Sequence, residues 1–134
     1  MKVLIYVAEL QSLEKTKAKE DVLQMWAQVN EAQVVGVVSE LNGANRMGSA
    51  GHGAVAEILS QYEVDAVVVA SASDFAKRKQ DMCAYVRGIR EMGADVISVA
   101  GDLPTCEECT AEMECESQEA HRRAYHCTVK IFHE

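Results

Sequence analysis

Short apolar runs alternate with amphipathic stretches through the first hundred residues of the chain. Four runs have the nearly continuous apolar character of buried parallel strands: residues 2–8, 33–38, 65–70 and 95–99. Three stretches between them repeat apolar residues at helical spacing: residues 14–30, 55–62 and 82–92. Gly93 provides a stop signal for the last helix. This alternation predicts an α/β fold, a doubly wound and mostly parallel sheet with helices on both faces.

The C-terminal part of the chain has a different pattern. Pro104, the only proline, closes the α/β unit, and residues 105–124 are polar, acidic and rich in cysteine. Residues 128–132 alternate between polar and apolar, which predicts one further strand at an edge of the sheet. We therefore expect two parts, an α/β domain of residues 1–101 and a short cysteine-bearing C-terminal extension of residues 102–134.

Composition and charge narrow the classes of function. With 134 residues, 49% of them apolar, the chain is long enough for one domain with a real core. No apolar run approaches the roughly 20 residues that span a membrane, and no signal-peptide pattern is present, so we expect a soluble cytoplasmic protein. The net charge is −8, with 3 basic and 8 acidic residues in 101–134 alone. An acidic surface repels phosphates, which predicts weak or no direct DNA binding.

Several short motifs follow one another in a characteristic order: the Tyr6 strand, Trp26-Ala27, residues 34–37, Asn42-Gly43, residues 52–59 and residues 62–69. In this order and spacing, residues 1–101 resemble the N-terminal catalytic domain of the serine recombinases, the resolvase/invertase family. The resemblance implies a three-layer αβα fold whose first four strands take the order 2-1-3-4. It also implies an ancestral chemistry in which a serine attacks a DNA phosphodiester while arginines hold the scissile phosphate.

The residues that would perform this chemistry are missing. The family's nucleophile position falls on Leu10, and its neighbouring arginine position falls on Ala8. Leucine has no nucleophile and no proton to give. Ser12 lies two residues further on, with no arginine near it in the sequence, so it is a poor substitute.

The other catalytic positions of the family have also changed. The family's arginine after its mobile loop, which Asn42-Gly43 matches here, falls on His52. A later family motif has Ser73 for its aspartate, Asp74 for its first arginine and Lys77 for its last. Asp74 places negative charge where a phosphate would lie. The resemblance therefore implies a catalytically inactive member, a protein-interaction or regulatory module linked to DNA recombination that contacts a protein partner or a second copy of itself.

A second hypothesis places a ligand at the carboxyl edge of the sheet. Ser71, Ser73 and Asp74 follow the third strand, and in open α/β sheets ligands gather at that edge. The chain would then be a small ligand-binding or enzymatic α/β domain. Serine and aspartate are also common helix caps, so the same residues are compatible with a structural role.

A third hypothesis concerns the cysteines. Cys106 and Cys109 form a C-x2-C pair, and His121 and His126 follow at a spacing near that of tetrahedral zinc sites, with Cys127 adjacent. The extension would then be a zinc-dependent interaction module. The intervening segment lacks apolar residues for a core, so free thiols in an acidic tail, or a redox pair, remain alternatives.

Overall fold

The computed structural model describes residues 1–9, 12–41, 50–76, 78–103 and 126–132. Along the chain these form the following elements: β1 (Lys2–Glu9), α1 (Leu13–Val29), β2 (Gln33–Leu41), α2 (Ala50–Gln61), β3 (Ala66–Val69), the short 3-10 turn η1 (Ala72–Asp74), α3 (Lys79–Glu91), β4 (Asp95–Ser98) and β5 (His126–Ile131).

The five strands form one sheet in the order β4-β3-β1-β2-β5. β1 lies in the centre, with Ile5 opposite Val37 of β2 on one side and Val68 of β3 on the other, all in parallel. β5 pairs antiparallel with the outer side of β2. The predicted order 2-1-3-4 and the predicted edge position of the last strand are both confirmed.

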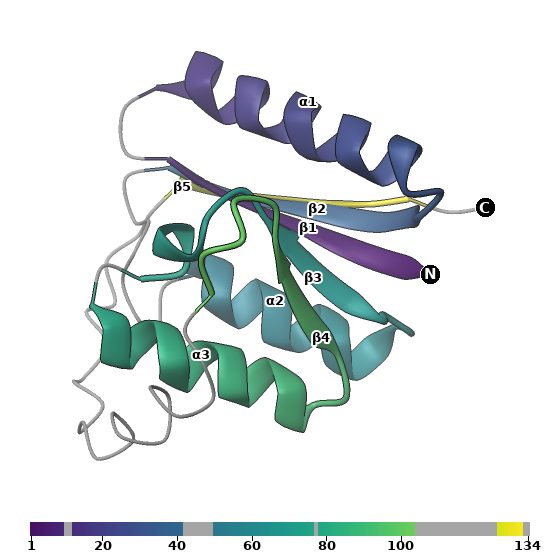
Figure 1. The fold of residues 1–134 in the computed structure, drawn as a ribbon. Helices are drawn as coiled ribbons and strands as arrows, with labels where there is room; N and C mark the ends of the chain where they lie inside the picture. The colour runs from purple at the N-terminus through teal and green to yellow at the C-terminus, as the bar shows by residue number, and fades with distance from the viewer. Residues whose placement is uncertain (10–11, 42–49, 77, 104–125, 133–134) are drawn as a thin grey trace.

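Helices cover both faces of the sheet, which confirms the predicted three-layer αβα architecture. α1 lies on one face, and α2 and α3 lie on the other (Figure 1). Because side chains alternate along a strand, β1 supplies both cores. Its Val3, Ile5 and Val7 pack with Leu23 and Ala27 of α1.

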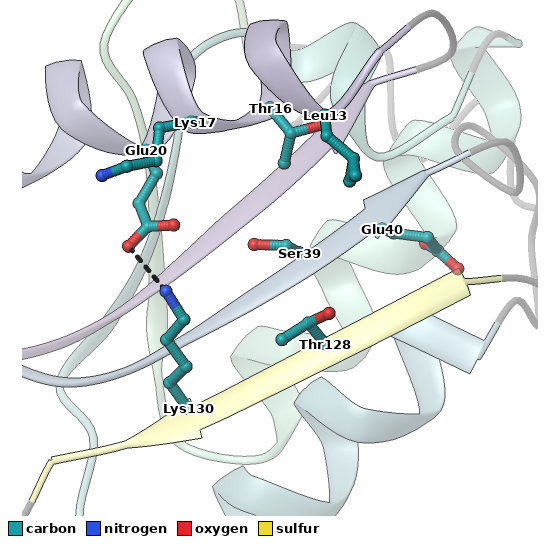
Figure 2. A pocket seen from close by; sticks show the side chains of 8 residues that line it. All are labelled: Leu13, Thr16, Lys17, Glu20, Ser39, Glu40, Thr128 and Lys130. Atoms are coloured by element: carbon teal, nitrogen blue, oxygen red, sulfur yellow. Dashed lines mark ion pairs between the residues drawn. The ribbon is translucent and has the colours of Figure 1, made fainter.

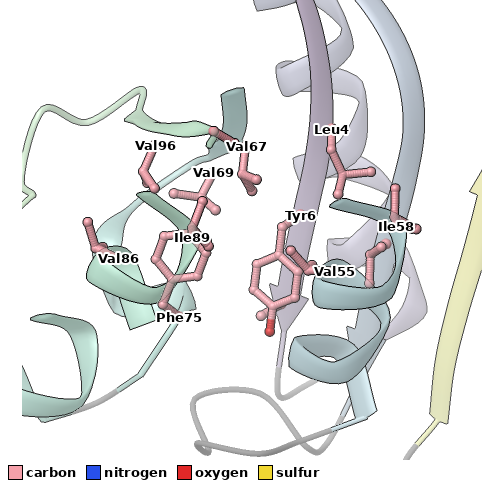
Figure 3. Packing of buried hydrophobic residues seen from close by; sticks show 13 residues of the cluster. Leu4, Tyr6, Val55, Ile58, Val67, Val69, Phe75, Val86, Ile89 and Val96 are labelled. Carbon is pink, nitrogen blue, oxygen red and sulfur yellow. The ribbon is translucent and has the colours of Figure 1, made fainter. Parts of the chain in front are cut away.

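The larger core lies under α2 and α3. Leu4 and Tyr6 of β1 pack there with Val55 of α2, Phe75 after η1 and Ile89 of α3 (Figure 3). Tyr6, Phe75 and Val55 are completely buried. Cys83 of α3 is also completely buried.

Local interactions fix where the helices begin and end. The Ser12 hydroxyl accepts a hydrogen bond from the Lys15 amide at 3.1 Å and caps α1. Gly93, after α3, has φ of 98°, a left-handed conformation that favours glycine. α2 begins at Ala50, five residues before the predicted start. Within the described residues, no helix is long and apolar enough to cross a membrane.

Candidate site at the carboxyl edge of the sheet

The carboxyl ends of the parallel strands meet at one edge of the sheet, where several candidate residues gather. Ala8 is near the end of β1, and Ser73 and Asp74 belong to η1, which follows β3. His52 lies in the first turn of α2, and its ring contacts Tyr6 of β1. The structure therefore brings four of the catalytic-position residues predicted from the sequence, Ala8, His52, Ser73 and Asp74, to this edge.

Lys19 of α1 joins this edge from the opposite face. Its ammonium donates to the Ala8 carbonyl at 2.8 Å and to Oδ1 of Asp74 at 3.0 Å, and it lies 3.3 Å from Oε1 of Glu9. The side chain of Asp74 is only 9% exposed, so the Lys19 ammonium rather than water balances its charge. No pattern in the sequence singled out Lys19.

The Lys19 cluster carries more negative than positive charge, because the carboxylates of Glu9 and Asp74 share one ammonium. Burial raises the pKa of Asp74; the hydrogen bond from Lys19 opposes that shift without cancelling it. Oδ2 of Asp74 is buried and has no hydrogen-bond partner among the described residues. A cluster of this charge disfavours a phosphate group.

His52 is a neutral residue in this structure. Its Nε2 lies 2.8 Å from the Phe75 carbonyl, which can only accept, so Nε2 carries the proton. The ring stacks on Tyr85 with centroids 3.9 Å apart. Burial lowers the pKa of His52 to about 4, although the bond to Phe75 favours the charged form. At neutral pH this side chain lacks the positive charge that an arginine would place there.

A buried carboxylate, Glu40 near the end of β2, contacts the first turn of α2. Its Oε2 accepts from the Tyr6 hydroxyl at 2.8 Å, and its Oε1 accepts from the Gly51 amide at 2.9 Å. Glu40 is completely buried, and burial together with this carboxylate raises the pKa of Tyr6 well above its usual value. Burial likewise raises the pKa of Tyr85. Sequence reasoning missed Glu40, since it reads as the start of a glycine-rich loop.

A separate cluster of hydroxyl groups surrounds Asp102. Its carboxylate accepts from the hydroxyls of Ser71 and Ser98, each at 2.6 Å, and from the Ala72 amide at 2.9 Å. Slight burial would raise the pKa of Asp102, but these hydrogen bonds outweigh it and lower the pKa. Asp102 thereby ties the end of β3 to the end of β4.

Ser71 is also the cap of η1, because its hydroxyl accepts from the Ser73 amide at 3.4 Å. This is the structural role that the sequence allowed for these residues. The Ser71 and Ser73 hydroxyls lie 3.2 Å apart. Binding of a ligand by Ser71, Ser73 and Asp74 stays a prediction.

Other candidate residues cannot be placed. Leu10 and Lys77 lie outside the described residues, as do Cys106, Cys109 and His121. His126 begins β5, but its side chain is outside the described set. Within the part of the chain that the structure describes, no three His, Cys, Asp or Glu side chains gather closely enough to hold a metal ion. The zinc site stays a prediction.

A hollow of about 240 Å³ lies between α1 and the strands β2 and β5 (Figure 2). Glu20 of α1 and Lys130 of β5 reach towards each other there, with Oε2 and Nζ 3.5 Å apart. The lining residues are Leu13, Thr16, Lys17, Glu20, Ser39, Glu40, Thr128 and Lys130. The ion pair fastens the C-terminal strand to α1.

Comparison with known families identifies the lineage. Residues 7–129 match the family model described as "Resolvase, N terminal domain". The chain belongs to the resolvase N-terminal domain family. This membership confirms the resemblance read from the sequence and relates the chain to DNA recombination. The match also extends through most of β5, which follows the cysteine-bearing segment.

Solved structures of resolvase-like domains share the fold. The catalytic domain of ISC1926 TnpA, an IS607-like serine recombinase, is 17% identical with a TM-score of 0.69, covering 85% of this chain and 76% of that one. A resolvase family site-specific recombinase from Streptococcus pneumoniae is 17% identical with a TM-score of 0.69, and the match covers 85% of this chain and 84% of that one. The N-terminal catalytic domain of TP901-1 integrase is 17% identical with a TM-score of 0.65, and the match covers 85% of this chain and 90% of that one. A search of curated proteins finds no match.

Proposed function

We propose that this resolvase-family chain performs no strand exchange and acts through protein contacts, as an interaction or regulatory module linked to DNA recombination. The observation that carries the proposal is the Lys19–Asp74 ion pair. Asp74 falls on a position that the family resemblance assigns to a phosphate-binding arginine, and Lys19 joins it to the Ala8 carbonyl.

Phosphoryl transfer needs positive groups around the scissile phosphate, because charge develops on its oxygens in the transition state. Among the described residues at this edge, the cation Lys19 is already paired with two carboxylates, Glu9 and Asp74. His52 is buried and neutral at pH 7. The site therefore offers a phosphate an excess of negative charge and no unpaired cation among these residues.

The sequence supports the same conclusion from the nucleophile. Leu10 falls on the family's serine position and supplies no attacking oxygen. Ser12 already accepts the Lys15 amide as the cap of α1, so its position is fixed by the helix start.

The proposal is tested first by DNA affinity. Fluorescence anisotropy with a labelled duplex, at near-physiological salt, should give half-saturation above about 1 µM, because the net charge of −8 opposes phosphate contacts. A titration at low salt is the control that the labelled DNA reports binding. Nanomolar affinity at near-physiological salt would contradict the proposal.

A further inference from the structure

The buried face of α1 changes character halfway along the helix. Its second half, Leu23 and Ala27, is apolar and packs on β1. Its first half, Thr16 and Glu20, is polar, yet these two residues are only 6% and 8% exposed. A helix that only covered a sheet would present apolar residues along the whole of this face. The polar half therefore requires an explanation of its own.

The sheet beneath the polar half of α1 is polar as well. Ser39 of β2 and Thr128 of β5 lie opposite each other in the strand register, and Lys130 follows Thr128 on the same face. All three line the hollow of about 240 Å³ under Thr16 and Glu20 (Figure 2). Short hydroxyl side chains leave space there that larger apolar residues would fill. The residues of both layers thus create the hollow.

Glu20 lacks full compensation for its burial. Among the described residues its one charged or hydrogen-bonding partner is Lys130, with Oε2 and Nζ 3.5 Å apart. That separation is longer than the roughly 2.7–2.9 Å of a close charge-assisted hydrogen bond. A carboxylate can accept about four hydrogen bonds, and burying it with few of them made is unfavourable. A polar group bound in the hollow would supply the missing partner.

We propose that this hollow binds a free α-amino acid. The ammonium of the ligand lies against the Glu20 carboxylate, and the carboxylate of the ligand lies against the Lys130 ammonium. The hydroxyls of Ser39 and Thr128 can donate to the ligand or accept from it. Within the described residues neither hydroxyl makes a hydrogen bond, so both are available.

The charges around the hollow favour a zwitterion over a simple ion. Lys130 is paired with Glu20, and Lys17, which also lines the hollow, is paired with Asp21. The Glu40 carboxylate is bonded on the other face of the sheet, towards α2. The described side chains of the hollow therefore carry no surplus charge of either sign. A ligand with one charge would leave a charge unbalanced, whereas a ligand with both preserves the balance.

The size and shape of the hollow also fit a molecule of this class. Pockets for drug-sized ligands measure about 300–1,000 Å³, so a hollow of about 240 Å³ suits a smaller molecule. None of the described lining residues is aromatic, which disfavours a nucleobase. The Glu20–Lys130 pair lies at one end of the hollow and Leu13 lies towards the other (Figure 2). Leu13 offers an apolar contact to an aliphatic side chain, so L-leucine is the chosen probe.

The test is an NMR titration of the full chain, in which backbone amide signals report where each ligand binds. L-Leucine should shift the signals of residues 13–20, 39–40 and 128–130 and saturate with a dissociation constant on the order of 1 mM. Each of two analogues, 4-methylpentanoate and isoamylamine, carries only one of the two charged groups of leucine. These analogues and glucose should bind at least about 10-fold more weakly.

Variants test the assigned contacts. Glu20→Gln keeps the size of the side chain and removes its charge, so it should weaken leucine binding by at least about 10-fold. The matched control is Glu57→Gln, at an exposed glutamate of α2 on the other face of the sheet, which should leave the binding unchanged. Thr128→Val removes one hydroxyl at an exposed position of β5 and should weaken the binding by about 3-fold or more.

Four results would each overturn the proposal. They are no saturable shift up to about 20 mM leucine, shifts that lie away from the hollow, equally tight binding of glucose or of either analogue, and wild-type affinity in Thr128→Val or in a folded Glu20→Gln variant. The proposal goes beyond the suggested role in protein contacts. None of its readouts involves DNA, so its failure leaves the DNA predictions intact.

Discussion

The Lys19 ammonium lies 3.0 Å from Oδ1 of Asp74, and the two residues are 55 positions apart in the chain. The pair joins α1, on one face of the sheet, to the turn after β3 at its carboxyl edge. Both partners are largely shielded from water, with side-chain exposures of 32% and 9%. The family resemblance assigns the Asp74 position to a phosphate-binding arginine, and here that position carries a carboxylate paired with Lys19.

Removing the cation should destabilise the fold. Lys19→Met leaves Asp74 and Glu9 without their shared ammonium, and we expect a loss of about 2 kcal/mol in the free energy of unfolding. Lys17→Met on the same helix is the matched control, because Lys17 and Asp21 are 71% and 63% exposed and such pairs contribute less than about 1 kcal/mol. Urea unfolding measures both variants. Equal losses would contradict the assigned role of Lys19.

His52 should make the protein sensitive to mild acid. Its pKa is about 4 in the folded chain against 6.5 when unfolded, so between these values the unfolded state binds more protons. The contribution of neutral His52 to the free energy of unfolding is therefore fully present above pH 6.5. It is lost as the pH falls towards 4, by up to about 3 kcal/mol.

The check compares wild type with His52→Gln, whose amide can still donate to the Phe75 carbonyl. Urea unfolding of both proteins from pH 7 to pH 4.5 should show a steeper decline for wild type, each curve being referred to its own value at pH 7. Parallel curves would show that His52 does not titrate as described.

Two glycines of α2 should respond oppositely to alanine. A Cβ at Gly51 meets the carboxylate of Glu40, which Tyr6 holds from the other side, so Gly51→Ala should cost about 1–3 kcal/mol. A Cβ at Gly53 meets nothing within 4 Å, so Gly53→Ala should stabilise by about 0.5–1 kcal/mol. Thermal and urea unfolding measure the change in the free energy of unfolding for both variants. A neutral Gly51→Ala would mean that Glu40 is not held in place.

The strands and most of the helices could be predicted from the sequence because they depend on local patterns of apolar and polar residues. Continuous apolar runs marked β1 to β4, and alternation marked β5. The start of α2 was missed because residues 50–53 contain two glycines and carry no helix signal. What stabilises that first turn is the Glu40 carboxylate on the Gly51 amide, a contact between separate elements.

The candidate site was only partly readable for the same reason. The strand-end rule placed Ser71, Ser73 and Asp74 at the carboxyl edge. Their partners could not be found from the sequence, since Lys19 is 55 residues from Asp74 and Asp102 is 31 residues from Ser71. The buried pair of Tyr6 and Glu40 spans 34 residues. Spacing rules describe neighbours along the chain, whereas these contacts depend on how the layers pack.

The loss of DNA chemistry is tested most directly by trapping a covalent protein–DNA adduct. Supercoiled DNA is incubated with the full chain, denatured and analysed for protein attached to DNA, with an active serine recombinase as the positive control. We predict no adduct, because Leu10 supplies no nucleophile and Lys19 is committed to Asp74 and Glu9. An adduct formed by the wild-type chain, especially one lost on Ser12→Ala, would contradict the account.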